Sequence, residues 1–463
     1  MYKSKLIQLY LSFSKEDLFQ LKKWLVLNSK QLHPDAIKLL NYLLKKQKIT
    51  KTVVNQERLF KQLYPKQKIN IARLRHVFSF SVQSLELFIK QKELFSDKQL
   101  TKKTLAKNYR TCGLKKYAQQ NLNQAKTILL EQETRNAQYY LNIYELELEQ
   151  FEISLTNTRP SSTNLQEIIS GFSTFFVINL LRYACISISH QNLYKTSYEL
   201  PLLDSTLKNI HAGNYDDVPA IQLYYYSYLV QTQEESLDSF EKLKFYILTY
   251  KNVLSSQEYR ELYTFVINYC IKQQNSGNTA FIQEAFDWYK LGIEESILLD
   301  NKGRLSRFTY LNTITLGLKL QQFDWVEKFI LTGAQLLEKE YQASYQHYNM
   351  GKFFFATKAY KKAMPLFLNM NYDDLFMNID IRVMQLKIYY EEQSWETLEY
   401  LLSSFYQFLQ RKSIMSYHKE NYLNLIKFTR ALTDSYDQQQ LTTSVQATNP
   451  LTERNWLLAQ IKK

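Results

Sequence analysis

Apolar residues recur every three or four positions along most of the chain, with polar residues between them. The segment after residue 70 shows this clearly, because Ile71, Leu74, Phe78, Val82 and Leu85 fall on one face of a helix. A repeat of about 3.6 residues indicates an amphipathic helix, whereas a half-buried strand would alternate every second residue. The pattern therefore predicts a chain built from amphipathic helices.

The first hundred residues are predicted to form a module of short helices. Ser14, with Asp17 three positions later, is typical of a capping box at a helix start. Pro34 suits the first turn of a second helix, and Pro65 closes a third before the fourth begins. We assign residues 1–100 to this N-terminal helical module.

A longer regularity appears beyond residue 100. An aromatic or apolar residue is followed after three positions by a small or apolar one, and after four more by a third large residue. Five such triplets are Phe240, Leu243 and Ile247; Ile282, Ala285 and Tyr289; Phe323, Val326 and Ile330; Tyr360, Ala363 and Phe367; and Trp395, Leu398 and Leu402. They recur every 35 to 42 residues, the size of a helix pair that must stack on its neighbours to bury its apolar face.

These periods predict an all-α fold in which residues 101–435 form an α-solenoid and residues 436–463 a C-terminal capping segment. After the polar tract 433–450, a last helix carrying Trp456 is expected to cover the end of the array. The low content of glycine and proline, 9 and 7 residues, supports helices, because ordinary proteins contain about 7% and 5% of them.

One unit has the small, large, aromatic, alanine and phenylalanine positions that tetratricopeptide repeats use for two antiparallel helices: Gly351, Phe354, Tyr360, Ala363 and Phe367. This unit resembles that family. The resemblance implies that Gly351 lets two helices approach closely while Phe354 fills the gap. In the preceding unit our alignment places Ile314 where this unit has Gly351.

The whole chain is also similar to a group of helical-repeat proteins from Bacteroidota genomes. The similarity is carried by stretches such as "SFSKEDLFQLKKWL", "NYDDLFMNIDIRVMQLKIYY" and "NPLTERNWLLAQI". It implies a helical fold and a bacterial, cytoplasmic setting. It carries over no catalytic or binding residue.

The charge is concentrated at one end of the chain. Residues 1–130 contain 27 basic and 7 acidic side chains, a net charge of +20, whereas the remaining residues contain 31 and 37, a net charge of −6. A basic patch is expected around the turn before the fourth helix: Lys66, Lys68, Arg73 and Arg75. It could be a solvated basic face or a contact for nucleic acid, and with so few arginines any such binding should be sequence-nonspecific and salt-dependent.

Asparagines recur in the first helix of the units. Asn312 and Asn349 each stand 11 residues before the aromatic of the second helix, and Asn268 lies in a similar "FVIN" context. The tetratricopeptide resemblance places such positions in the groove, where an amide offers a donor and an acceptor to an extended peptide. We therefore predict a peptide groove at Asn268, Asn312, Asn349 and Lys352. The alternative is that these asparagines only bond locally within their helices.

Motifs for catalysis, cofactors and metals are missing from the sequence. The closest glycines, Gly292 and Gly303, are too far apart for a phosphate loop, and the cysteines Cys112, Cys185 and Cys270 are too distant for a zinc module. His347 falls on an inferred core-facing position, so a packed histidine is expected there rather than a ligand. We expect no enzyme, cofactor or metal site.

The most apolar run, "STFFVINLLRYACISI", contains Asn179 and Arg182, which we take as an interruption too early for a membrane span. A soluble cytoplasmic protein is therefore expected. The predicted function is a non-catalytic scaffold or adaptor that holds a protein or peptide partner. The alternatives are a nucleic-acid-associated regulator that binds phosphates through the lysines of residues 1–130, and self-assembly with a second copy.

Overall fold

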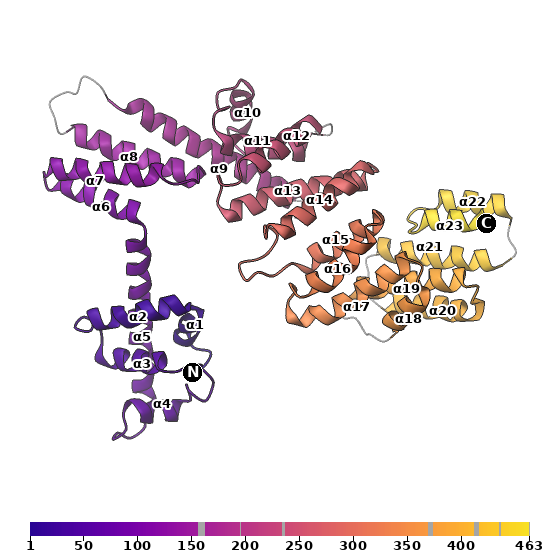
Figure 1. The fold of residues 1–463 in the computed structure, drawn as a ribbon, viewed down its shortest axis with the longest axis horizontal. Coiled ribbons are helices and arrows are strands. Elements are labelled where there is room, and N and C mark those ends of the chain that lie inside the picture. The colour runs from indigo at the N-terminus through magenta and orange to yellow at the C-terminus, as the bar shows by residue number, and fades with distance from the viewer. Residues whose placement is uncertain are drawn as a thin grey trace. The chain divides into compact units, whose positions relative to one another are not determined.

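The chain folds entirely into helices. The computed structural model describes residues 1–155, 163–194, 196–233, 237–368, 374–411, 416–434 and 437–462, without the side chains of 192–193 and 416–418. Within these ranges there are 23 α-helices and, in place of a sheet, one isolated antiparallel bridge between Leu299 and Leu305 (Figure 1). The predicted all-α class is confirmed.

Five helices form the N-terminal module: α1 (Lys5–Ser12), α2 (Lys15–Leu27), α3 (Pro34–Leu44), α4 (Gln56–Leu63) and α5 (Ile71–Ser96). The long α5 packs against α1, α3 and α4 around a core of leucines and aromatic rings. The capping box is confirmed, since the Asp17 backbone N–H donates to Ser14 Oγ and the Ser14 backbone N–H donates to the Asp17 carboxylate. The short helix α1 was not anticipated.

The helices that follow are α6 (Lys98–Thr111), α7 (Lys115–Leu130), α8 (Ala137–Leu155), α9 (Leu165–Tyr194), α10 (Leu203–His211) and α11 (Pro219–Thr232). α6 packs closely on α7, and α7 on α8, around a small core that includes Ala118, Leu122 and Leu146. Small residues on α6 and α7 allow this close contact between the helices.

Helix pairs make up the next part of the chain: α12 (Leu237–Thr249), α13 (Ser256–Asn275), α14 (Ala280–Glu294), α15 (Arg307–Lys319), α16 (Phe323–Ala334), α17 (Lys339–Ala356), α18 (Tyr360–Leu368), α19 (Leu375–Glu391) and α20 (Trp395–Arg411). Each helix from α12 to α20 packs against the next one along the chain. Each of the five sequence triplets lies on the second helix of a pair, α12, α14, α16, α18 or α20, and its last two residues are buried.

Glycines set the close approach within two pairs. A Cβ at Gly351 of α17 would lie 2.4 Å from Phe367 of α18, as expected for the position where the helices approach. A Cβ at Gly317 of α15 would lie 2.5 Å from Val326 of α16. In this pair our alignment has the large residue Ile314 at the position of Gly351, and the small residue at the close approach is Gly317, one turn nearer the loop.

The same turn joins several pairs. In the loops α15–α16, α17–α18 and α19–α20 the middle residue of three is left-handed, with φ of 57° at Gln321, 57° at Lys358 and 54° at Gln393. The next residue donates its backbone N–H to a carbonyl five positions earlier, as Ala359 does to Phe354. Gly113 takes this place between α6 and α7 with φ of 73°.

The C-terminal segment is more helical than the sequence suggested. After α21 (Ser416–Thr433), the segment forms two helices, α22 (Gln438–Ala447) and α23 (Arg454–Ile461). We expected only the last of these, but Asp437 accepts a hydrogen bond from the Gln440 N–H, and Leu441 and Val445 enter the core shared with α19–α21. Two apolar residues one turn apart are thus enough to hold a helix of Gln, Thr and Ser on this core.

The chain divides into two compact units. The first comprises residues 1–187, 196–222 and 252–254, and the second residues 188–195, 223–251 and 255–463. The first unit therefore joins the N-terminal module to helices that we assigned to the repeats. The expected boundaries at residues 100 and 435 stay predictions.

One helix is long and apolar enough to cross a membrane by length and composition, among the residues that the structure describes. It is α9, over Leu165–Gln191, with a mean hydropathy of 1.4 in its most apolar window. Asn179 and Arg182, which we took to interrupt the apolar run, both lie inside this one continuous helix. Of that window, 39% is buried inside the structure, as in a helix that packs against its neighbours along one side.

Candidate functional site

Polar side chains form a line across three consecutive first helices, α15, α17 and α19. Lys352 of α17 donates to the Thr315 hydroxyl of α15 at 3.3 Å, and its ammonium lies 3.7 Å from the Asp380 carboxylate of α19. Tyr348, one turn before Lys352, donates its hydroxyl to the same carboxylate. The side chains of Lys352 and Asp380 are 19% and 43% exposed, so the line is partly open to solvent.

Asn312 lies one turn before Thr315 on α15 and is exposed. Its amide donates to the hydroxyl of Tyr289 on α14 at 3.0 Å. Burial raises the pKa of Tyr289, so this phenol stays protonated and keeps its own O–H as a donor. The Asn312 side chain is therefore exposed, with its amide N–H engaged within the chain.

Asn268 lines a pocket of its own. It is exposed on α13, beside Lys272 one turn later, in a pocket of about 310 Å³ whose other walls come from α9 and α11. There Ser189 donates to the Gln231 amide oxygen at 2.9 Å. The lining of this pocket therefore combines two polar side chains, Asn268 and Lys272, with apolar ones that include Val230 and Phe265.

Asn349 does not belong to this surface. It is fully buried, and its amide donates to the Tyr345 carbonyl at 2.8 Å, one turn earlier on α17. His347, which we expected in the core, is exposed. Both expectations are wrong, because α17 packs with Asn349 inside and His347 toward solvent, although Gly351 of the same helix lies against α18 as expected. Asn349 is the locally bonded asparagine of the alternative interpretation.

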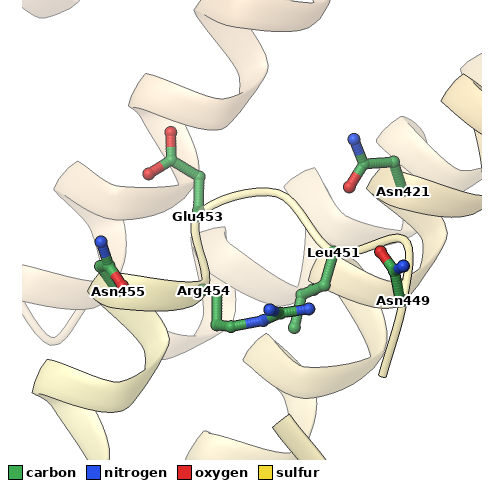
Figure 2. A pocket seen from close by; sticks show the side chains of 6 residues that line it. All are labelled: Asn421, Asn449, Leu451, Glu453, Arg454 and Asn455. Carbon is green, nitrogen blue, oxygen red and sulfur yellow. The ribbon is translucent and has the colours of Figure 1, made fainter. Parts of the chain in front are cut away.

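A polar pocket lies at the C-terminal segment (Figure 2). Its volume is about 480 Å³, and its lining residues are Asn421, Asn449, Leu451, Glu453, Arg454 and Asn455. The Arg454 side chain extends toward Leu451 and Asn449, while Glu453 points away from it (Figure 2). The Asn421 Oδ1 and Arg454 Nε atoms are buried without a hydrogen-bond partner, so an acceptor and a donor are left unsatisfied beside this pocket.

Glu453 connects this pocket to α19. Its carboxylate accepts from Lys387 at 2.5 Å, and the Lys387 ammonium lies about 6 Å from the rings of Phe355 on α17 and Trp456 on α23. Lys387 stands two turns after Asp380 on the same helix. The line through Lys352 and Asp380 and the C-terminal pocket are therefore joined along α19.

The predicted basic patch is divided by the structure. Arg73 is engaged, since it pairs with Asp35 at 3.1 Å, donates to Gln67 at 2.7 Å and lies 4.1 Å from the Tyr64 ring centroid. It joins α3, the turn after α4 and α5, so its charge is already paired within the chain. Arg75, Lys66 and Lys68 are exposed.

The three cysteines form no disulfide among the described residues, and two of them are buried: Cys185 and Cys270. Burial raises the pKa of the Cys270 thiol to about 12, so the reactive thiolate is not formed near neutral pH. In the described part of the chain no group of three or more His, Cys, Asp or Glu side chains has the arrangement of a metal site.

No model of a known protein family, no curated protein and no solved structure matches this chain. The candidate site therefore stands on its own geometry. Of the predicted groove residues, Asn312 and Lys352 belong to one surface and Asn268 to a neighbouring pocket in the same unit.

Sequence reasoning missed Tyr348, Asp380, Lys387 and the pocket around Arg454. Tyr348 and Asp380 stand 32 residues apart, close to one repeat period, so pairing polar residues between consecutive first helices would have found them. The pocket had no comparable signal, because its residues come from two separate segments, Asn421 of α21 and residues 449–455.

Proposed function

We propose that the chain is a non-catalytic adaptor that holds an extended segment of a partner protein along the first helices α13, α15, α17 and α19. The observation that carries this proposal is the line Thr315, Lys352, Asp380, in which polar side chains of three successive repeats meet at one surface. Repeat proteins bind extended partners on such surfaces, because each unit adds one row of side chains.

The packing of the helices supports this choice of surface. First helices pack on each other across units, α15 on α17 and α17 on α19. Comparable packing of α14 on α16, α16 on α18 or α18 on α20 is not found among the described residues. A layer of closely spaced helices lies on the inner side of a curved stack, which is where a solenoid of these pairs would have its groove.

The charges along the surface fit a polar, extended ligand. Lys352 on α17 and Asp380 on α19 have opposite charges, Lys387 follows two turns later on α19, and Asn312 and Asn268 add amides. Backbone N–H and C=O groups of a strand-like segment alternate in the same way, so such a surface can bind a peptide main chain with modest demands on its sequence. The C-terminal pocket would take a carbonyl or carboxylate oxygen at one end, bound by the Arg454 guanidinium.

The test uses a photo-crosslinking amino acid in the full chain, expressed in its own cells. One variant carries it at Asn268 and a second at Asn312, both exposed on first helices; the matched control carries it at Lys361, exposed on the second helix α18. We expect a discrete crosslinked protein from the first two positions and little from the third. Adding Lys352→Ala should reduce the crosslink at Asn312 by about tenfold or more, since it removes a charged contact worth about 1.5–3 kcal/mol.

Equal crosslinking at Lys361, or a crosslink at Asn312 unchanged by Lys352→Ala, would contradict this function. A circular dichroism spectrum of each variant should match the parent, because none of the substituted side chains is fully buried. Asn349 is left intact, since its burial would make any substitution a test of stability.

The second candidate function, a regulator that binds phosphates nonspecifically, is favoured by the exposure of Lys66, Lys68 and Arg75 within a region of net charge +20. Treating half of each cell lysate with nuclease before irradiation separates the two functions. A protein that is still crosslinked after nuclease treatment is held by the first helices. A protein that is crosslinked only in the untreated half is held through nucleic acid, which assigns the function to the basic N-terminal region.

A further inference from the structure

Helix α9 has two apolar faces, and the described part of the chain buries only one of them, although Phe172 on the other face keeps a ring contact with Tyr144 of α8 at 5.6 Å between centroids. The covered face includes Val177, Ile178, Leu181 and Ala184, all buried. Gly171 on this side lies against the backbone of α8, where an added Cβ would be 3.1 Å from the Tyr144 nitrogen. A helix that is apolar all round is normally buried all round, so the second face needs a partner.

The second face is a straight stripe of six exposed side chains: Leu165, Ile169, Phe172, Phe176, Tyr183 and Ile186. We call it the α9 stripe. Its members are separated by four, three, four, seven and three residues, which is the spacing of a coiled-coil seam. Asn179 occupies the seam position between Phe176 and Tyr183, with its amide donated to the Phe175 carbonyl at 3.0 Å.

The area of the α9 stripe is large for a surface that stays in water. Its six side chains are between 36% and 56% exposed. With roughly 200 Å² for a complete side chain of this size, they present about 600 Å², at the upper limit of apolar patches on monomers. Two such stripes would together bury about 1,200 Å², which reaches the range of specific protein interfaces.

Charge decides between the possible occupants. Between residues 163 and 187 the only charged side chains are Glu167 and Arg182, and their positions in the helical repeat lie outside the stripe. An acidic or basic partner would find no counter-charge there. The neutral seam of a second copy matches it in spacing, in length and in lack of charge, and meets no like-charge repulsion at the seam itself.

We propose that two copies of the chain pair through the α9 stripe, with the second copy's α9 as the occupant. The pairing is driven by apolar burial, while the basic residues 1–130 of the two copies repel each other. Added salt screens that repulsion and therefore strengthens the pair. Binding to nucleic acid would respond to salt in the opposite direction.

The experiment is sedimentation velocity of the full chain at several concentrations and at two salt concentrations. The expected result is a concentration-dependent dimer that tightens with salt. Ile169→Glu and Tyr183→Glu should each weaken it by about tenfold or more, because a carboxylate would be buried in the seam. Leu130→Glu is the matched control, since Leu130 is 65% exposed on α7 of the same unit and lies off the stripe; it should leave the dimer unchanged.

Flotation with neutral phosphatidylcholine vesicles tests the other occupant, a lipid surface. A monomeric chain that floats with vesicles, and stops floating with Ile169→Glu, would overturn the pairing in favour of membrane contact. A monomer that does not float, or a dimer that survives both stripe substitutions, would also overturn it. The stripe residues are exposed, so all variants should keep the helical content of the parent.

Discussion

Single residues decide how the helices begin and how closely they approach. Gly351 and Gly317 sit where any side chain would overlap Phe367 or Val326. At the other end of the chain, Asp17 joins two helices: it closes the capping box of α2 and accepts a hydrogen bond from Lys92 of α5 at 2.5 Å. These hydrogen bonds lower the pKa of Asp17 to about 2.

Asp17→Asn should loosen α2, because the cap loses its charge and Lys92 its partner. We expect a loss of about 1 kcal/mol near pH 7, the usual effect of a helix cap. The stabilisation by Asp17 is present above its unfolded pKa near 4 and is lost as pH falls toward 2, since its folded pKa is depressed. The protection of α2 against hydrogen exchange should therefore differ between the parent and Asp17→Asn at pH 7, and this difference should disappear as the pH is lowered. A difference that stays constant as the pH falls toward 2 would contradict this role.

At the scale of elements, the repeated three-residue turn uses a left-handed residue without always using glycine. Gln321, Lys358 and Gln393 all have positive φ, whereas Gly113 occupies the corresponding place between α6 and α7. A residue with a Cβ is strained in this region, by roughly 1–2 kcal/mol. Glycine at these three positions would therefore relieve backbone strain and make the protein more stable.

Lys358→Gly should stabilise the α17–α18 pair by up to about 1 kcal/mol, because the strain that is relieved exceeds the entropy that glycine loses. Gly113→Ala should destabilise α6–α7 by about 1 kcal/mol, from backbone strain alone, as a Cβ there meets no atom within 4 Å. Hydrogen exchange at the helix ends beside each loop measures both effects. Lys358→Ala is the control: it removes the same exposed charge, keeps the strained φ and should change little.

At the scale of the whole molecule, separate cores predict separate stabilities. The N-terminal module has one core, α6–α8 another, and the helices from α15 onward two more, which meet at α19. In chains of this kind each unit depends chiefly on its neighbours, so unfolding need not be a single transition.

Leu39→Ala and Leu402→Ala compare two of these cores. Leu39 is 0% exposed in the N-terminal module and Leu402 is 1% exposed in the C-terminal core, so each substitution should cost about 2–5 kcal/mol. We expect Leu39→Ala to increase hydrogen exchange in α1–α5 only, and Leu402→Ala in α19–α23 only. An increase that spreads over both regions would mean that the chain unfolds as one cooperative body.

The sequence by itself determined the class of fold, because helix formation is local. The period of the apolar residues, the caps at Ser14 and Pro34, and the triplets of the second helices identify most of the helices without reference to the rest of the chain. It missed α22, whose two apolar residues are meaningful only beside the core that receives them.

Only the tertiary structure decided which face of each helix meets water. Asn349 and His347 are two positions apart on α17 and equally polar, yet one is buried and the other exposed, according to how the neighbouring helices pack. Arg73 is engaged by Asp35 from another helix, and the α9 stripe is exposed because no described part of the chain covers it. A helical period shows that a face is apolar, but the contacts between distant segments decide which side chains remain free to bind.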